Sequence, residues 1–352
     1  MKYAKHRQHI SWQRLSLIAL CAILSLILFV MLFATAYVHH LLSLVTDNGG
    51  DSLNETLSSE QLATLTPSPD DDTPITGPSV DHEDVTQATL PSQSVEQLKT
   101  EGIINIMLIG EDRRPGQGRQ RSDSMILCSF NTNTNTITMI SFLRDIYISN
   151  IPGYNRAEKL NAAYAMGGPK TLNQTLATYF GIHVDANVVV DFDGFTGIID
   201  MLGGVDINLT QKEATHLNEK GFSRLTAGTN HLNGAEALAY SRIRKIDMDA
   251  MRAQRQRTVL TALINAYKSK SVTEMAILAS DILKTGFVQT DMSSDELLGY
   301  VRSLFPMLSS STINSQQIPA SGTYQEMNVG KIVDCKVIDL DINRKILKNI
   351  FQ

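Results

Sequence analysis

The segments INIMLIG, at residues 104–110, and SMILCSFNTNTNTITMISF, at residues 124–142, decide the fold. The first is a short apolar run that ends at a glycine, which predicts a buried strand. The second contains two apolar runs around an Asn/Thr turn, which predicts a β-hairpin. The folded part is therefore predicted to begin with a β-meander.

The residues that follow alternate between helix and strand patterns. Residues 159–181 predict helices on either side of Gly167-Gly168, and residues 188–209 predict a strand, a helix and a strand. Patterns with a serine N-cap predict helices at 271–287 and 293–308, followed by a strand at 311–320 and an amphipathic helix at 341–351. The predicted fold class is α/β, a mixed central β-sheet flanked by helices.

Residues 15–38, LSLIALCAILSLILFVMLFATAYV, contain no charge and are long enough to cross a hydrocarbon core of ~30 Å as a helix. Four cations and no acid precede this stretch: Lys2, Lys5, Arg7 and Arg14. This charge bias predicts that residues 1–14 are cytoplasmic and that the chain beyond the span is extracellular. The alternative is a cleaved signal peptide, but the stretch exceeds the ~7–15 apolar residues of such a peptide. We therefore expect a single-pass signal-anchor in the cell membrane.

Residues 39–98 are predicted to be a disordered, acidic, extracellular linker. Eleven carboxylates occur between Asp47 and Glu96, and no Lys or Arg occurs between Arg14 and Lys99. A segment so rich in Ser, Thr, Pro and Asp cannot bury enough apolar surface to offset the entropy lost on ordering. We expect the catalytic domain to occupy residues 99–352.

The formal charge of −5 hides a slightly basic outer domain. The charge divides into +4 before the span, −11 in the linker and +2 from Lys99 onward. Because this charge is small and aromatic residues are only 6% of the chain, no nucleic-acid partner is expected. The three cysteines form no Cys/His metal spacing; Cys128 and Cys335 could pair, which the sequence does not decide.

Asp112 and Asp123 bracket the loop EDRRPGQGRQRSD between the first two predicted strands. Carboxylates at one edge of a sheet can converge on a hard cation such as Mg²⁺, with Mn²⁺ as the alternative. Arg121 stands two residues before Asp123 and therefore projects on the same side of the chain. The arrangement predicts a metal-diphosphate site, although solvated turn residues are the alternative. No GK[ST] follows the glycines, which excludes a P-loop.

A second group of cations lies in YSRIRKIDMDAMRAQRQR, from Tyr240 to Arg257. Arg242 and Arg244 alternate as on an extended strand, and helical spacing aligns a further three polar residues: Arg252, Arg255 and Gln256. The same helix face continues with Val259 and Leu263. Since guanidinium groups bind phosphate oxygens in a bidentate manner, this face predicts binding of an amphiphile with a phosphate head. A solvated charged face is the alternative.

The chain resembles the LytR-CpsA-Psr family between about Ile103 and Tyr267. Seven ordered segments carry the resemblance: IMLIGEDRR, RSDSMIL, SFLRDIYISNIPG, KLNAAYAMGG, VDFDGFTGIIDMLGGVDINL, LNGAEALAYSRIR and DMDAMRAQRQRTVL. The resemblance implies an α/β sandwich with a hydrophobic tunnel for a prenyl chain. It also implies a membrane-anchored, Mg²⁺-dependent phosphotransferase that moves a teichoic acid or capsular polysaccharide from undecaprenyl diphosphate to peptidoglycan.

The resemblance also assigns roles to particular residues. It places the Mg²⁺ ligands at Asp112 and Asp123, and the diphosphate-binding side chains at Arg121, Arg144, Arg242, Arg244, Arg252 and Gln256; helical spacing adds Arg255. The catalytic candidates are Arg144, Asp145 and Arg242. Asp145 would orient the acceptor hydroxyl or take its proton, and a structural salt bridge with Arg144 is the alternative.

Two positions depart from the family pattern. Leu143 replaces a usual proline, and Ile148 replaces a usual cation. The candidates to supply the missing charge are Arg113, Arg114, Arg156 and Lys159. Two other functions stay open at this point: a hydrolase that releases the polymer to water, and a non-enzymatic binder or regulator of lipid diphosphates.

Overall fold

The computed structural model describes nearly all of the chain from Lys99 to Gln352 and a few segments before it. The described ranges are 36–37, 39–40, 43–44, 53–58, 78–81, 85, 99–113, 118–222, 224–244, 246 and 249–352. The predicted cytoplasmic residues 1–14 and nearly all of the predicted span at 15–38 lie outside these ranges. Within the described ranges, no helix has both the length and the hydropathy of a membrane span.

A six-stranded mixed sheet forms the centre of the molecule. Its strand order is β10-β7-β2-β3-β4-β11. The predicted meander is confirmed, because β2 (Ile103–Glu111), β3 (Ser122–Asn131) and β4 (Thr136–Phe142) pair antiparallel in sequence. β7 (Ala186–Asp191) joins β2 in parallel, and β11 (Thr312–Ile318) joins β4 in parallel. The short β10 (Gln289–Thr290) completes the other edge.

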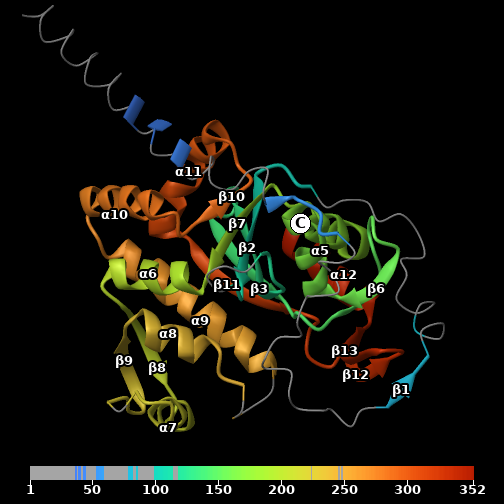
Figure 1. Ribbon diagram of the computed structural model, residues 1–352. Helices are drawn as coiled ribbons and strands as arrows, with labels where there is room; N and C mark the ends of the chain where they lie inside the picture. Colours follow the sequence, from blue (N-terminus) through green and yellow to red (C-terminus); the bar gives the residue numbers. More distant parts are fainter. Residues whose placement is uncertain are drawn as a thin grey trace, which may run out of the picture.

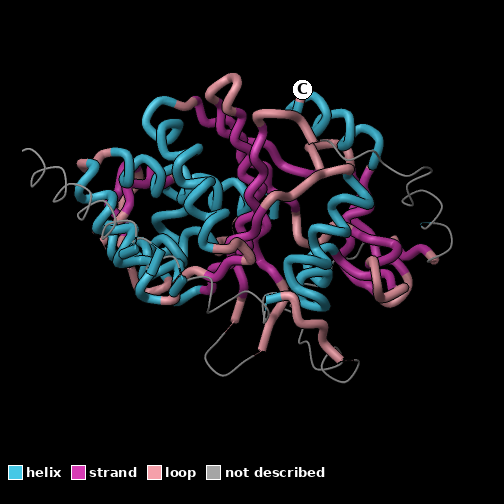
Figure 2. Tube along the Cα trace, turned by 90° about the horizontal axis from the view of Figure 1, so that it is seen from above, coloured by secondary structure: helices cyan, strands magenta, loops and turns pink. Residues whose placement is uncertain are grey.

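Helices cover both faces of this sheet, as expected for the α/β class (Figures 1 and 2). On one face lie α5 (Leu160–Phe180) and α12 (Leu340–Phe351). On the other lie α6 (Phe192–Leu202), α8 (Gly234–Ser241) and α9 (Asp249–Lys268), followed by α10 (Val272–Thr285) and α11 (Ser294–Ser310).

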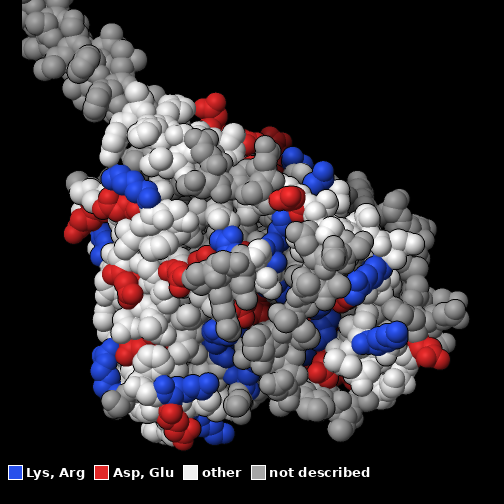
Figure 3. All heavy atoms as spheres, viewed as in Figure 1, with Lys and Arg blue, Asp and Glu red and all other residues white. Residues whose placement is uncertain are grey.

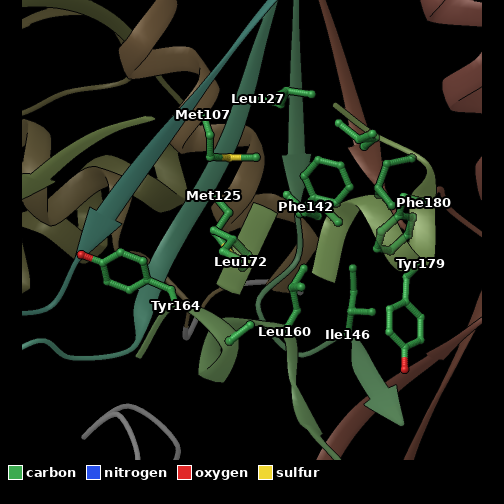
Figure 4. Close-up of a cluster of buried hydrophobic side chains, with 14 of the residues drawn as sticks. Met107, Met125, Leu127, Phe142, Ile146, Leu160, Tyr164, Leu172, Tyr179 and Phe180 are labelled. Carbon is green, nitrogen blue, oxygen red and sulfur yellow. The ribbon is translucent and has the colours of Figure 1, made fainter. Parts of the chain in front are cut away.

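Alternation along the strands explains this arrangement. Met125 and Leu127 of β3 join the main core beneath α5, whereas Ile126 and Cys128 pack on the opposite face, where Leu260 of α9 contacts them. Successive strand side chains point to opposite faces, so a strand that is apolar throughout must be covered on both. Figure 4 shows the first of these cores, with side chains of the strands and of α5 meeting between the two layers.

Three smaller sheets complete the fold. One pairs β5 (Tyr147–Ile151) with β6 (Arg156–Lys159), and another pairs β8 (Val205–Leu209) with β9 (Gly228–Leu232), between which α7 (Gln211–Glu219) lies. The third contains β1 (Ser79–Val80), β12 (Tyr324–Val329) and β13 (Ile332–Ile338).

Described parts of the predicted linker depart from the expected disorder. Leu53 is buried in the main core, and β1 pairs in parallel with β12. The backbone at Leu53 crosses α5 where Gly168 interrupts the helix with a φ of 67°; a Cβ at Gly168 would lie 1.8 Å from the Leu53 carbonyl oxygen. Glycine is therefore required at this crossing, both for its conformation and for the close approach. Single apolar residues within this polar segment, such as Leu53 and Val85, supply the contacts with the cores of the domain.

Cys128 and Cys335 are both buried and form no disulfide with each other. Burial raises the pKa of each thiol to about 12. Because the thiolate is the reactive form, both behave as small apolar side chains.

Candidate active site between the sheet and helix α9

A cavity of about 270 Å³ lies between the sheet and the helices α6, α8 and α9. Most of its wall is hydrocarbon from strands and helices alike: Leu108, Ile126, Val188, Val190, Phe195, Ile198, Leu260 and Leu263. The charged and amide residues in its wall are Asp123, Asp191, Arg242, Arg244, Arg252 and Gln256. They gather where β2 and β7 end and β3 begins, because Gly110 pairs with both Ser124 and Val190. The cavity therefore has a polar end and an apolar interior.

Helices α8 and α9 supply the polar end with cations. Arg242 directly follows α8, and its guanidinium stacks over the ring of Phe192 at 4.3 Å from the centroid. Arg252 lies in the first turn of α9 and is 5% exposed; its Nη2 donates to the backbone oxygen of Asp123 at 3.4 Å. Gln256 lies one turn further along the same face. Arg242, Arg252 and Gln256, which the sequence spacing predicted to lie together, line the same cavity.

Asp123 connects the cavity to a buried ion-pair network. Its Oδ1 accepts a hydrogen bond from Nη1 of Arg144 at 2.9 Å, and Arg144 is only 4% exposed. Nε of Arg144 lies 3.4 Å from Asp145, whose other oxygen lies 3.0 Å from Nζ of Lys159. Arg144 therefore contacts the wall residue Asp123, while the described lining of the cavity does not include Arg144 itself.

Asp145 is placed as an ion-pair partner. Burial by itself would raise its pKa, but the charges of Arg144, Lys159 and Lys336 outweigh burial and hold the pKa of Asp145 below its usual value. A carboxylate held ionised by three cations is a poor acceptor for a proton. Asp145 is also absent from the described cavity wall, so the geometry favours the salt-bridge interpretation.

Arg255 projects away from the cavity. Its Nε donates to Oε1 of Glu213 at 2.7 Å, and its Nη1 donates to the backbone oxygen of Ile243 at 3.0 Å. Arg255 is 2% exposed, and Glu213 belongs to α7. These hydrogen bonds connect α9 to α7 and to the segment between Arg242 and Arg244. The side chain of Arg255 is thus placed differently from the predicted contact with a diphosphate.

The two predicted metal ligands lie at the end of the β2–β3 pair. Asp112 directly follows the last residue of β2, and Asp123 is the second residue of β3, at the register shift where Glu111 pairs with Ser122 and Gly110 pairs with Ser124. Only Asp123 is part of the described cavity wall. Within the described ranges, no group of three or more His, Cys, Asp or Glu side chains is placed to hold a metal ion. A pair of carboxylates still fits Mg²⁺, which is commonly held by one or two carboxylates and completed by water and substrate phosphate.

The other predicted cations lie beside this end. Arg121 Nη2 lies 3.8 Å from Glu158, which also accepts from Arg156. Arg113 pairs with Asp191 of the cavity wall at 3.1 Å, whereas Arg114 lies outside the described residues. Ile148, the position with the missing family cation, is 1% exposed in the core.

Glu111 is a buried acid that sequence reasoning did not single out. It accepts hydrogen bonds from the backbone of Gln120 at 2.5 Å and from the Tyr164 hydroxyl at 3.2 Å. Burial raises its pKa, although Gln120 and Arg113 oppose the change. Glu111 therefore ties the loop that carries Arg121 to α5. In the sequence, its place directly after an apolar run, in LIGEDRR, is the feature that could have indicated a buried acid.

The surface carries charges of both signs. On the face seen in Figure 3, acidic and basic side chains are interspersed, without a continuous basic area. A nucleic-acid surface would present a basic patch or stripe. The expectation that the chain has no nucleic-acid partner stays a prediction from the sequence.

A hydrocarbon-lined cavity with guanidinium groups at one end has the chemistry that suits an amphiphile with an anionic head. Comparison with known proteins gives the family. The chain belongs to the LytR_cpsA_psr family, whose pattern matches residues 74–342. The match begins well before Lys99, which agrees with the docking of β1 on β12.

Two relatives illustrate how the family has been described. The polyisoprenyl-teichoic acid–peptidoglycan teichoic acid transferase TagT of Bacillus subtilis is 33% identical over 264 residues, covering 69% of this chain and 79% of TagT. The regulatory protein MsrR of Staphylococcus aureus is 32% identical over 259 residues, covering 72% of this chain and 76% of MsrR.

Solved structures share the fold. The structure of TagT bound to LIIa-WTA superposes with a TM-score of 0.58 at 29% identity, covering 74% of this chain and 95% of that chain. A structure of YwtF (TagT) with bound octaprenyl pyrophosphate lipid gives a TM-score of 0.54 at 27% identity, covering 74% and 98%.

Proposed function

We propose that the chain is a Mg²⁺-dependent phosphotransferase that attaches a glycopolymer from undecaprenyl diphosphate to peptidoglycan and releases undecaprenyl phosphate. The observation that carries the proposal is the cavity that joins a guanidinium-lined end to a hydrocarbon interior. Family membership and the names of the transferase relatives make the chain an enzyme of the transferase class. The proposal also includes anchoring by residues 15–38 and a catalytic domain outside the membrane.

The prenyl chain would occupy the apolar interior, between residues such as Ile126, Phe195 and Leu263. Its diphosphate would lie at the polar end, where Arg242, Arg244, Arg252 and Gln256 surround it in our assignment. Arginine suits this position because its planar fork binds two phosphate oxygens and keeps its charge when partly desolvated.

Asp112 and Asp123 are the residues that would hold Mg²⁺, and the ion would neutralise part of the charge on the diphosphate. Arg144 holds Asp123 in place through their 2.9 Å hydrogen bond. In our assignment Asp145 holds Arg144 in place through its ion pair, and Lys159 in turn holds Asp145.

In the reaction, an acceptor sugar hydroxyl oxygen forms a bond to the phosphorus next to the polymer. The bond from that phosphorus to the bridging oxygen breaks, and prenyl phosphate leaves with that oxygen. The hydroxyl proton ends on the leaving phosphate or on water. Phosphoryl transfer passes through a loose transition state in which positioning and charge stabilisation carry most of the catalysis. The arginines at the polar end of the cavity are suited to both tasks.

The test uses the full chain in detergent micelles with a labelled prenyl-diphosphate glycan and peptidoglycan fragments. We expect prenyl phosphate to be released and the label to appear on the fragments, only when Mg²⁺ is present. Asp123→Asn should abolish both signals, whereas Asp341→Asn, which changes an exposed acid on α12, should leave them unchanged.

Two outcomes would contradict the proposal. Release of free polymer without an acceptor would identify a hydrolase. Tight lipid binding without release of prenyl phosphate would identify a binding or regulatory protein, the description that the MsrR relative carries.

A further inference from the structure

A second cavity lies on the opposite side of α9. Its volume is about 330 Å³, and its wall comes from β8, α9 and β11. Along α9, Arg252, Gln256 and Leu263 line the first cavity, whereas Arg257, Thr261 and Asn265 line the second. Because an α-helix repeats every 3.6 residues, these two sets fall on opposite faces of the helix. The second cavity shares no described residue with the first.

Arg257 is the only cation among the described residues of this wall, and it is 8% exposed. Its Nε donates to Oγ of Ser315 at 3.0 Å. Its Nη1 is buried and has no hydrogen-bond partner among the described residues. No acid among the described residues forms an ion pair with Arg257. Burial lowers the pKa of Arg257, and no neighbouring acid opposes this. An unpaired buried cation is costly unless an anion accompanies it.

The remainder of the wall suits sugar hydroxyls. The hydroxyl of Thr258 donates to the Gln254 carbonyl at 3.0 Å, and that of Thr261 donates to the Arg257 carbonyl at 2.9 Å. Their protons are therefore used within the helix, and their oxygen lone pairs can accept from a ligand. The side-chain amides of Asn208, Gln254 and Asn265 offer both donors and acceptors.

The wall contains one described acid, Asp206, which is largely exposed and lies 2.7 Å from Nδ1 of His231. It disfavours an anion at its own end of the cavity and so favours binding next to Arg257.

We propose that this cavity is a second binding site, for an oxyanion carried on a hydroxyl-rich sugar, with Arg257 as the partner of the anion. The shared chemistry is a carboxylate or a phosphate group beside several hydroxyls. The proposal does not depend on phosphoryl transfer in the first cavity, and a binding experiment tests it separately.

The experiment measures thermal unfolding of the full chain in an Arg252→Gln background, which weakens anion binding in the first cavity. The probes are glucose 1-phosphate, N-acetylmuramic acid and, as the neutral control, N-acetylglucosamine. Since a ligand that binds only the folded state raises the unfolding temperature, we expect at least one anionic probe to do so and the neutral sugar to have a smaller effect. A response to the phosphate alone or to the carboxylate alone identifies the source of the anion, and either supports the site.

Adding Arg257→Gln should weaken binding of the active probe at least tenfold. Adding Arg302→Gln, which removes an exposed arginine on α11, should not. Without ligand, Arg257→Gln should unfold at the same temperature or higher, because it removes an unpaired buried charge. If Arg257→Gln does not fold, Arg257→Lys tests the same point by keeping the charge and losing the planar fork.

Two results would overturn the proposal. One is an equal response to the anionic probes with and without Arg257→Gln. The other is no stabilisation by either anion at concentrations well above about 1 mM.

Discussion

The two cavities beside α9 differ in how their cations are arranged. The first has three arginines at one end of a hydrocarbon chamber, which suits a ligand with a charged head and an apolar tail. The second has a single buried arginine among hydroxyl and amide groups. One cationic segment serves both, and Arg255 points in a third direction, to Glu213. The partner of each guanidinium, rather than the local density of arginines, therefore decides what that arginine does.

The substitution with the greatest predicted consequence removes the ion pair between Arg255 and Glu213. Arg255→Gln leaves Glu213 buried without its partner, and loss of one member of a buried ion pair costs about 3–5 kcal/mol of unfolding free energy. Chemical denaturation measures this loss. Transfer activity per folded molecule should change little, because Arg255 does not reach the described cavity wall.

The double variant Arg255→Met with Glu213→Gln is the matched control and should regain most of the stability, since it leaves no buried charge unpaired and an amide oxygen can keep the capping hydrogen bonds from Thr210. If Arg255→Gln keeps its stability but loses transfer activity, Arg255 binds the diphosphate, and the assignment as a structural ion pair is wrong.

The second effect concerns the first cavity alone. Arg252→Gln removes one guanidinium from the polar end, and removal of one preorganised donor to a charged transition state typically lowers kcat by about 100- to 1000-fold. The rate of prenyl phosphate release measures the loss, with Arg302→Gln as the charge-matched control. A loss below about threefold would show that Arg252 binds no phosphate in the transition state.

Much of this arrangement could be predicted from local patterns. Alternating and continuous apolar runs gave the meander and the flanking helices, because they report burial directly. The positions of the strand ends predicted a polar edge of the sheet that includes Asp123. Helical spacing predicted that Arg252 and Gln256 share a face of one helix, and both line the first cavity.

The remaining features depend on partners that are distant in sequence. Glu213 lies 42 residues from Arg255 in the chain, and Ser315 lies 58 residues from Arg257. No local pattern reports such pairs. The docking of Leu53 was missed for a related reason, because one apolar residue in a polar segment has no periodicity.

A third prediction concerns the acid behind the first cavity. Glu111 has a raised pKa in the folded protein, so between its unfolded value near 4.5 and the raised value the native state binds more protons than the unfolded state. Its contribution to stability is therefore complete below that unfolded value and is lost as the pH rises through the folded pKa. Glu111→Gln should remove this slope, which for one proton is at most about 1.4 kcal/mol per pH unit. Denaturation curves at several pH values measure it, and an identical slope in the variant would contradict the assignment.

A fourth prediction, with a modest effect, concerns the face of α9 that lines the second cavity. Gln254 lines the second cavity and its side chain is exposed, so Gln254→Ala should fold normally. If its amide binds a sugar hydroxyl, the loss of one hydrogen bond should cost about 0.5–1.5 kcal/mol, or roughly two- to tenfold in affinity for the anionic sugar. Titration calorimetry in the Arg252→Gln background measures this change. Prenyl phosphate release by Gln254→Ala alone should stay at the level of the unmodified chain, because Gln254 and Gln256 lie on opposite faces of the helix. A decrease in release as large as that of Arg252→Gln would mean that the two faces do not act independently.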